Sequence, residues 1–314
     1  MKHCLIRDPL CFEPASPRGG RRPEGGVLVN GMLYPELFKS LEKARWNMQD
    51  NVPWDRFDGT LLSDEQALTV KMNAITEWSA LPATEMFLRD NKDDSDFSAF
   101  VSIWFYEEQK HALVLMEYLE RFRPDLVPSR QELEAVRFEF TPAPPLETLM
   151  LHFCGEVRLT QWYRRASAWH TEPVIKHIYT LLSKDEARHG GAYLKYMKRA
   201  IETLGDQARA AFAKLGVLMA NAKGSRALHP TNLHVNKALF PRDTVQSRLP
   251  DPGWLERWLN AQIKFDKTWE ERVARGILRH LSSLFGETFE TARDLHRYRK
   301  QLGARLQARA DATV

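Results

Sequence analysis

Two copies of the tetrapeptide Glu-x-x-His constrain the fold of this 314-residue chain more than any other feature. The first runs from Glu108 to His111 and the second, 78 residues later, from Glu186 to His189. On an α-helix, residues three apart share a face, so each tetrapeptide can direct a carboxylate and an imidazole at one metal ion. The chain is therefore expected to bring two helices together around a buried metal site. The alternative is that both are surface pairs on solvated helix faces.

Helix start and stop signals surround the first motif. A capping box at Ser63 predicts a helix over 63–89, with a kink at Pro82. A polar break at 91–95 precedes a predicted helix over 96–122, which carries the motif. No apolar run alternates as a strand would, so we expect an all-α fold.

The second motif follows a long proline-rich link at 123–144. Helices are predicted over 145–170 and 173–204, where Thr171-Glu172-Pro173 supplies an N-cap and Gly205 the end. Two short connections and one long crossover are the connectivity of a ferritin-like four-helix bundle, up-down-down-up.

Composition divides the chain into three parts. Residues 1–30, rich in Pro, Gly and Arg, are expected to be a mobile N-terminal tail. Residues 31–222 are expected to form the bundle, and 223–314 a C-terminal helical extension packed on it. Outside the four main helices, helical segments are predicted within 34–58 and over 206–222, 252–282 and 287–310.

Residue counts from the two helix turns select the remaining ligands. Glu108 lies 13 residues after the first turn and Glu77 lies 14 before it. Glu186 lies 13 residues after the second turn and Glu156 lies 15 before it. At 1.5 Å per residue all four lie roughly 20 Å from the turns, at one height. Glu85 is too near the first turn to join them.

Four carboxylates and two imidazoles suit a pair of iron or manganese ions, and four negative charges neutralise two divalent ions. The predicted metal ligands are Glu77, Glu108, His111, Glu156, Glu186 and His189.

This ligand order, with Asp-Glu-x-Arg-His from Asp185 to His189, resembles that of the diiron carboxylate oxidases. The resemblance covers about residues 34–222. In length, leading aromatic segment and extra C-terminal helices the chain is most similar to soluble acyl-carrier-protein desaturases. The resemblance implies two iron ions, with a manganese–iron pair as the alternative, and an oxygen-dependent oxidation.

The chain also departs from these relatives. Desaturases have a threonine three residues after the third-helix glutamate, where this chain has Leu159. Thr160 stands four residues after Glu156, as in the multicomponent monooxygenases, and the resemblance implies it as a catalytic residue beside a bridging-type ligand. The alternative is a hydroxyl that bonds the carbonyl one turn back. Leu115 replaces the tyrosine of the ribonucleotide reductase subunit, and Leu182 the extra histidine of the diiron N-oxygenases.

Further residues are candidates for supporting roles. Asp185 is expected to orient a ligand histidine together with Arg188. Trp46 or Trp54 is a candidate electron relay through Asp185, with core packing as the alternative. His152 is a candidate seventh ligand, proton donor or core histidine.

Aromatic and apolar residues at helical spacing from the ligands either line a substrate cavity or simply pack in the core: Trp104, Phe105, Phe153, Leu159 and Trp162. Basic residues either dock an acidic carrier or ferredoxin or form a solvated face: Arg164, Arg165, Lys195, Lys198, Arg199, Arg293, Arg297, Arg299 and Lys300.

The leading functional hypothesis is a diiron oxidase that acts on an apolar, acyl-carrier-bound substrate as a desaturase or monooxygenase. The rivals are a non-catalytic iron-binding protein or ferroxidase and an amine N-oxygenase. Expected partners are a separate electron donor (ferredoxin or reductase), an acyl carrier protein and a second copy of the chain.

A net charge of +4 gives little reason to expect nucleic acid. No stretch has the roughly 20 apolar residues that a membrane span needs. Three scattered cysteines, Cys4, Cys11 and Cys154, indicate a reducing cytoplasm.

Overall fold

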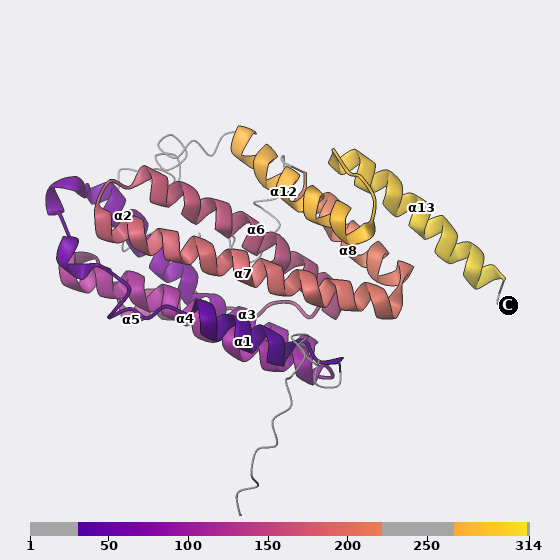
Figure 1. Cartoon of the computed structure of the whole chain (residues 1–314), viewed down its shortest axis with the longest axis horizontal. Helices are drawn as coiled ribbons and strands as arrows, with labels where there is room; N and C mark the ends of the chain where they lie inside the picture. Colours follow the sequence, from indigo (N-terminus) through magenta and orange to yellow (C-terminus); the bar gives the residue numbers. More distant parts are fainter. Residues whose placement is uncertain (1–30, 222–266, 313–314) are drawn as a thin grey trace, which may run out of the picture.

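The computed structural model describes residues 31–221 and 267–312, and these are helical with no strand among them (Figure 1). The expected all-α fold is confirmed for this part of the chain. The predicted tail at 1–30 and the first part of the helix predicted over 252–282 lie outside the described residues. No helix in the described ranges is long and apolar enough to cross a membrane.

The first predicted bundle helix is two helices, α2 (Asp64–Trp78) and α3 (Ala80–Asp90). They separate at Ser79, whose N–H bonds back to residues 76 and 77. Pro82 explains the position of the break, because proline has no N–H and its ring excludes the carbonyl four residues before it. The predicted kink at Pro82 is therefore a break three residues earlier, and it places Glu77 in the last turn of α2.

The other bundle helices agree with their predicted bounds within one residue. They are α4 (Ser95–Phe122), α6 (Pro145–Trp169) and α7 (Pro173–Leu204). The link between α4 and α6 holds a single short α-helix, α5 (Arg130–Glu134). Before α2 come α1 (Tyr34–Ala44) and the 3-10 turns η2 (Trp54–Arg56) and η3 (Gly59–Leu61), and η4 (Pro124–Leu126) follows α4.

Contacts at the two ends of the bundle establish the direction of each helix. At the end of α4, Arg123 pairs with Asp64 at the start of α2 (2.8 Å). At the start of α6, the Thr148 hydroxyl bonds Asp90 at the end of α3 (3.1 Å). The link from α4 to α6 therefore runs the length of the bundle. As a result α4 and α6 run in one direction, while α2, α3 and α7 run in the other (Figure 1).

Glu172 fixes the short turn between α6 and α7. Its fully buried carboxylate accepts from the N–H groups of Val174 and Ile175, as an N-cap does, and from the Tyr118 hydroxyl. Pro173 occupies the first helical position. The N-cap predicted within residues 171–173 is thus Glu172.

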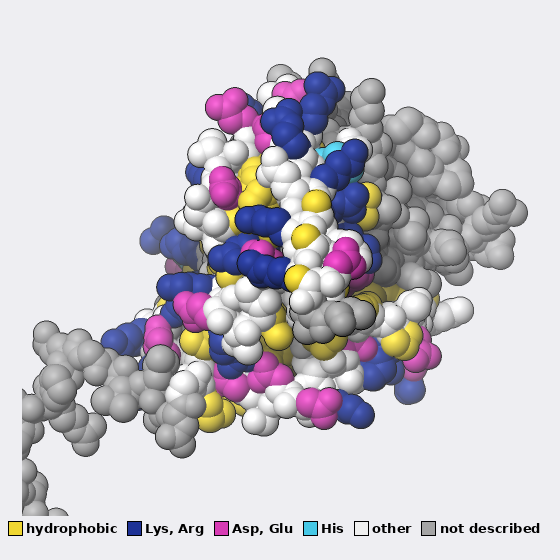
Figure 2. Space-filling view, turned by 90° about the vertical axis from the view of Figure 1, so that its right-hand side faces the viewer, with side chains coloured by type: hydrophobic (Ala, Val, Ile, Leu, Met, Phe, Trp, Pro, Cys, Tyr) yellow, Lys and Arg dark blue, Asp and Glu magenta, His cyan; other side chains and the backbone are white. Residues whose placement is uncertain are grey.

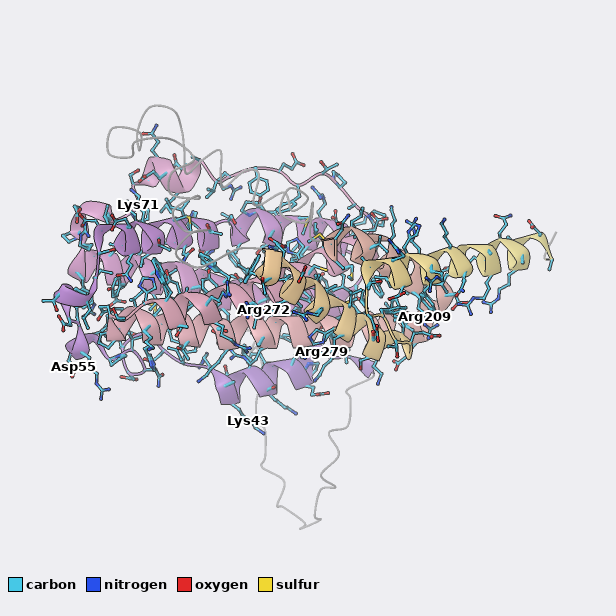
Figure 3. All side chains as sticks on the ribbon, turned by 90° about the horizontal axis from the view of Figure 1, so that it is seen from above. Lys43, Asp55, Lys71, Arg209, Arg272 and Arg279 are labelled. Carbon is cyan, nitrogen blue, oxygen red and sulfur yellow. The ribbon has the colours of Figure 1, made fainter. Side chains whose placement is uncertain are left out.

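Three further helices flank the bundle: α8 (Asp206–Met219), α12 (Lys267–Phe285) and α13 (Ala292–Asp311). α12 contacts α6 and α8, and α13 contacts α8. Gly216 permits this close approach, because a Cβ there would lie 2.7 Å from the Leu281 side chain. Seen from above, α12 carries Arg272 and Arg279 on its outer side, and Arg209 marks the end of the molecule near α13 (Figure 3).

Candidate metal centre

All six predicted ligands lie in the middle of the bundle and are almost completely shielded from solvent. Their exposed fractions are Glu77 3%, Glu108 4%, His111 0%, Glu156 4%, Glu186 0% and His189 2%. They come from α2, α4, α6 and α7, one glutamate from each helix, as the common height required.

The six residues form two overlapping groups, each with ligand atoms within 4.8 Å of one another. Glu108 and Glu186 belong to both groups, so an ion bound in each group would share them. The chain was expected to use Glu156 as a bridging-type ligand, but Glu156 belongs to one group only. The groups are Glu77, Glu108, His111 and Glu186, and Glu108, Glu156, Glu186 and His189.

The two histidines present the same ring atom to the carboxylates. The Nδ1 atom of His111 lies 3.5 Å from Glu77 Oε2 and 3.4 Å from Glu186 Oε1. The Nδ1 atom of His189 lies 2.9 Å from Glu108 Oε1 and 3.5 Å from Glu186 Oε2. Each half of the centre therefore offers one imidazole nitrogen together with carboxylate oxygens.

The opposite ring nitrogens meet two more acids. His111 Nε2 lies 3.1 Å from Asp185 Oδ2, and His189 Nε2 lies 3.0 Å from Glu107 Oε2. Arg188 joins the pair, since its Nη2 donates to Asp185 Oδ1 (2.6 Å) and Glu107 Oε1 (2.7 Å). Each acid thus orients the histidine of the other helix, as acceptors around metal-bound histidines do. Asp185 was predicted in this role from the sequence, whereas Glu107 was not.

A tryptophan and a lysine adjoin this acidic pair. Trp46 Nε1 donates to Asp185 Oδ2 (2.7 Å), whereas Trp54 Nε1 donates to the Met48 carbonyl. Of the two candidate relays, Trp46 is therefore the one in contact with Asp185. The buried Lys110 ammonium lies 4.2 Å from the Trp46 ring centre and 3.6 Å from Asp185 Oδ2. Lys110 was not among the residues predicted from the sequence.

The two carboxylates that belong to one group only are held by different donors. Glu77 Oε1 accepts from the Tyr163 hydroxyl in a very short contact. Glu156 Oε1 accepts from Trp104 Nε1 at 3.0 Å. Both donors orient a ligand and leave its second oxygen directed at the centre.

The unpaired atoms at the centre provide a test of whether metal ions fit. Among the described residues, six buried ligand atoms have no hydrogen-bond partner: Glu108 Oε1, Glu156 Oε2, both Glu186 carboxylate oxygens, His111 Nδ1 and His189 Nδ1. Buried polar atoms without partners are costly and rare. Six such atoms directed at one another would be satisfied together by cations, which the two ligand groups could hold.

The charge distribution agrees with this requirement. Burial, more than any neighbour, raises the pKa of Glu108 to about 7. Burial and the nearby Glu108 and Glu156 carboxylates raise the pKa of Glu186 well above its usual range. Burial opposes a charge on His111, yet the neighbouring carboxylates of Asp185, Glu186 and Glu77 outweigh it and raise the pKa of His111. The raised pKa values of Glu108 and Glu186 reflect the cost of burying several carboxylates together, a cost that bound cations would lower.

A cavity of about 100 Å³ reaches the centre from one side. Its wall includes Glu77, Glu108 and Glu156, together with Ala80, Ala83, Trp104, Leu159 and Met219. Of the residues expected to line a cavity, Trp104 and Leu159 do so. Phe105, Phe153 and Trp162 instead pack in the hydrophobic clusters.

Thr160 and His152 take less direct places than expected. The Thr160 hydroxyl bonds the Glu156 main-chain carbonyl (2.8 Å), and the residue is not among those that line the cavity. This is the alternative considered for Thr160, and it arises because a mid-helix hydroxyl reaches the carbonyl four residues back. His152 lines the cavity and packs against Phe87 but belongs to neither ligand group.

Comparison with known proteins adds no family to this description. No protein family model matches the sequence, and no curated protein is significantly similar to it. What the chain does must therefore be argued from the centre itself.

Proposed function

We propose that this chain is an oxygen-dependent diiron oxidase built on a ferritin-like four-helix bundle. The observation that carries the proposal is the pair of ligand groups that share Glu108 and Glu186. One imidazole and several carboxylates for each ion suit iron, with a manganese–iron pair as the alternative. Iron in such a centre supplies the activation of dioxygen, which side chains cannot carry out.

The protein's own residues hold the ions, exclude water and admit the substrate. Asp185 and Glu107 fix the ring orientation of His111 and His189. The cavity beside Glu77 and Glu156 supports oxidation of an apolar substrate, because its wall carries Ala80, Ala83, Trp104, Leu159 and Met219. A wall of this kind favours an oxidase over an iron-storage protein. N-oxygenation loses support, because His152 does not join the ligands.

Electrons for this reaction come from a separate donor protein in our proposal. The contacts from Trp46 to Asp185 and from Asp185 to His111 form a continuous route to one ion. Basic side chains gather on the end of the molecule that carries the last turns of α13, as Figure 2 shows. This end suits an acidic partner, either a ferredoxin or a carrier protein with a bound acyl chain.

Metal analysis after anaerobic iron loading tests the proposal. The wild-type chain should bind two irons, and Glu108→Ala or Glu186→Ala should lose most of both, because each removes an oxygen ligand from both groups. Glu85→Ala is the matched control, since this exposed glutamate pairs with Arg137 on the surface and should leave iron content unchanged.

Fewer than one iron per wild-type chain would overturn the metal site. Dioxygen consumption no faster than that of free iron would overturn the oxidase while leaving the metal site in place.

A further inference from the structure

Tyr163 connects the metal centre to a part of the bundle that the proposed function does not use. Its ring is fully buried on α6, and its hydroxyl donates to Glu77 Oε1. Oxidation of a phenol requires that an electron and a proton leave together. At Tyr163 both have a destination, the metal pair for the electron and the Glu77 carboxylate for the proton.

A line of aromatic rings continues from Tyr163 towards the end of the bundle. The rings of Tyr163 and Tyr179 are stacked, with centres 5.6 Å apart and planes at 17°. The Tyr179 ring lies 5.2 Å from that of His170, which lies 4.7 Å from that of Trp169. The first three rings are fully buried and Trp169 is half-buried. The line therefore begins at a ligand and reaches the surface.

The end of this line lies at the turn between α6 and α7. Trp169 is the last residue of α6, and the neighbouring Thr171 hydroxyl approaches the Leu61 carbonyl ahead of α2 (3.4 Å). Figure 3 places this end of the molecule, marked by Asp55, opposite the end marked by Arg209. The aromatic line thus leaves the centre along the bundle axis and away from α12 and α13.

The surroundings of the line suit the passage of an electron. Neither ring nitrogen of His170 has a hydrogen-bond partner among the described residues, and burial lowers its pKa to about 3. The ring is therefore neutral and does not repel positive charge on its neighbours. The Tyr179 hydroxyl accepts from Asn73 Nδ2 (2.7 Å), which fixes the ring beside Tyr163.

Aromatic contacts are common in protein cores, and most of them only contribute packing energy. Two features distinguish this line from ordinary packing. One end is hydrogen-bonded to a carboxylate that belongs to a metal ligand group, and the other is an indole that solvent can reach.

We infer that Tyr163, Tyr179, His170 and Trp169 form a one-electron route that, used once for each electron the oxidised centre needs, returns it to its resting state when no substrate occupies the cavity. The inference rests on the proposed function. The oxidant is the metal pair after it has reacted with dioxygen, and the reductant is a soluble one-electron donor such as ascorbate.

The transfer balances in three steps. Tyr163 gives one electron to the metal pair and its phenolic proton to Glu77, which leaves a neutral tyrosyl radical. One electron from Trp169, passed across the rings of His170 and Tyr179, restores Tyr163, and the proton returns from Glu77. Trp169 releases its indole proton to water and then takes a hydrogen atom from ascorbate.

The test exposes the iron-loaded, reduced protein to dioxygen without substrate or ascorbate. Freeze-quenched samples should show a tyrosyl radical by electron paramagnetic resonance, and peptide mass analysis should show oxygen added to Trp169. Tyr163→Phe should lose both signals even when it is loaded to two irons per chain, with a higher iron concentration used during loading where the loss of the bond to Glu77 weakens binding. Tyr179→Phe keeps the contact between Tyr163 and Glu77, so it should keep the radical and lower oxidation of Trp169 at least several-fold.

The matched control is Tyr193→Phe. Tyr193 is an equally buried tyrosine of α7, but its hydroxyl has no hydrogen-bond partner among the described residues. This variant should retain the radical and the oxidation of Trp169. Iron uptake and dioxygen consumption without a Tyr163-dependent radical would overturn the inference and leave the proposed function standing. Failure of the wild-type chain to take up iron would overturn both.

Discussion

The six predicted ligands are flanked by two groups of mostly buried side chains with opposite character. On one side Glu107, Lys110, Asp185 and Arg188 form a network of charges around the outer nitrogens of the ligand histidines. We call this group the charged face. On the other side is a row of aromatic rings, each in contact with the next: Tyr163, Tyr179, His170 and Trp169. We call this group the aromatic face.

Lys110 and His170 make the difference concrete, because both are buried bases. Burial lowers the pKa of Lys110, but Asp185 and Glu107 act against that effect. Burial lowers the pKa of His170 to about 3, and no acid opposes it. Burial alone thus favours the neutral form, and a nearby carboxylate decides whether a charge can persist. The charged face can fix ligand orientation by electrostatics, whereas the aromatic face is held by packing and single hydrogen bonds.

The largest expected effect is on metal affinity, which should fall when the charged face is altered and stay unchanged when the aromatic face is altered. Asp185→Asn removes the charge that orients His111 and should lower iron affinity about 10–100-fold, as loss of such a partner commonly does. Glu107→Gln should act similarly through His189. Competition with a chelator measures both. Glu117→Gln, which changes a half-buried glutamate of α4 paired with Arg121, is the control. Unchanged affinity in Asp185→Asn would remove the functional distinction between the faces.

The next effect concerns acid stability on the aromatic face. The pKa of His170 is about 3 in the folded chain against a reference value of 6.5, so the unfolded chain binds the proton first as pH falls. The stabilisation by neutral His170 is therefore complete above pH 6.5 and decreases below it, by about 2 kcal/mol at pH 5.

His170→Leu should remove this part of the acid dependence of the unfolding free energy, measured by urea titration at pH 7.5 and pH 5. The control is His177→Leu, which replaces a half-buried histidine in the second turn of α7. Equal acid dependence in wild type and His170→Leu would show that His170 gains partners or solvent in solution.

A smaller effect is expected from a single hydrogen bond. Tyr179→Phe removes the acceptor of Asn73 and should lower the unfolding free energy by about 1 kcal/mol. Because the aromatic face does not orient the ligands through charge, iron affinity should stay at the wild-type value. A drop in affinity comparable to that of Asp185→Asn would contradict the comparison.

The smallest effect is expected at Thr160. Its hydroxyl bonds a main-chain carbonyl of its own helix, so Thr160→Val should change stability by no more than about 0.5 kcal/mol and leave iron content unchanged. Leu159→Ala is the variant to compare with Thr160→Val, because Leu159 lines the cavity and Thr160 does not. A change in the dioxygen reaction of Thr160→Val would restore the catalytic role that the resemblance implied.

The clustering of the six predicted ligands could be foreseen because helix geometry converts residue counts into heights along the bundle. Glu77 and Glu156 have no motif of their own and were selected only by distance from a turn. Glu107 could also have been predicted from the sequence, because an acidic residue directly precedes the glutamate of each Glu-x-x-His motif. Asp185 and Glu107 occupy equivalent positions, and the structure gives them equivalent contacts.

Other features depend on contacts between helices that spacing does not determine. Tyr163 lies two turns after Glu156 on the same face of α6, but its contact with Glu77 depends on the rotation of α2. A buried lysine such as Lys110 has no sequence signal, because charged residues are usually exposed. Pro82 predicted a kink in the first bundle helix. Because the proline ring clashes with the turn before it, the helix instead breaks at Ser79.

The break at Ser79 also gives the four ligand-bearing segments unequal stiffness. Glu108, Glu156 and Glu186 lie within uninterrupted helices, where a shift of the backbone at the glutamate would bend the whole helix. Glu77 lies two residues before the break between α2 and α3 and borders the cavity. A backbone shift at Glu77 is therefore expected to disturb fewer helical hydrogen bonds than a shift at any of the other three glutamates.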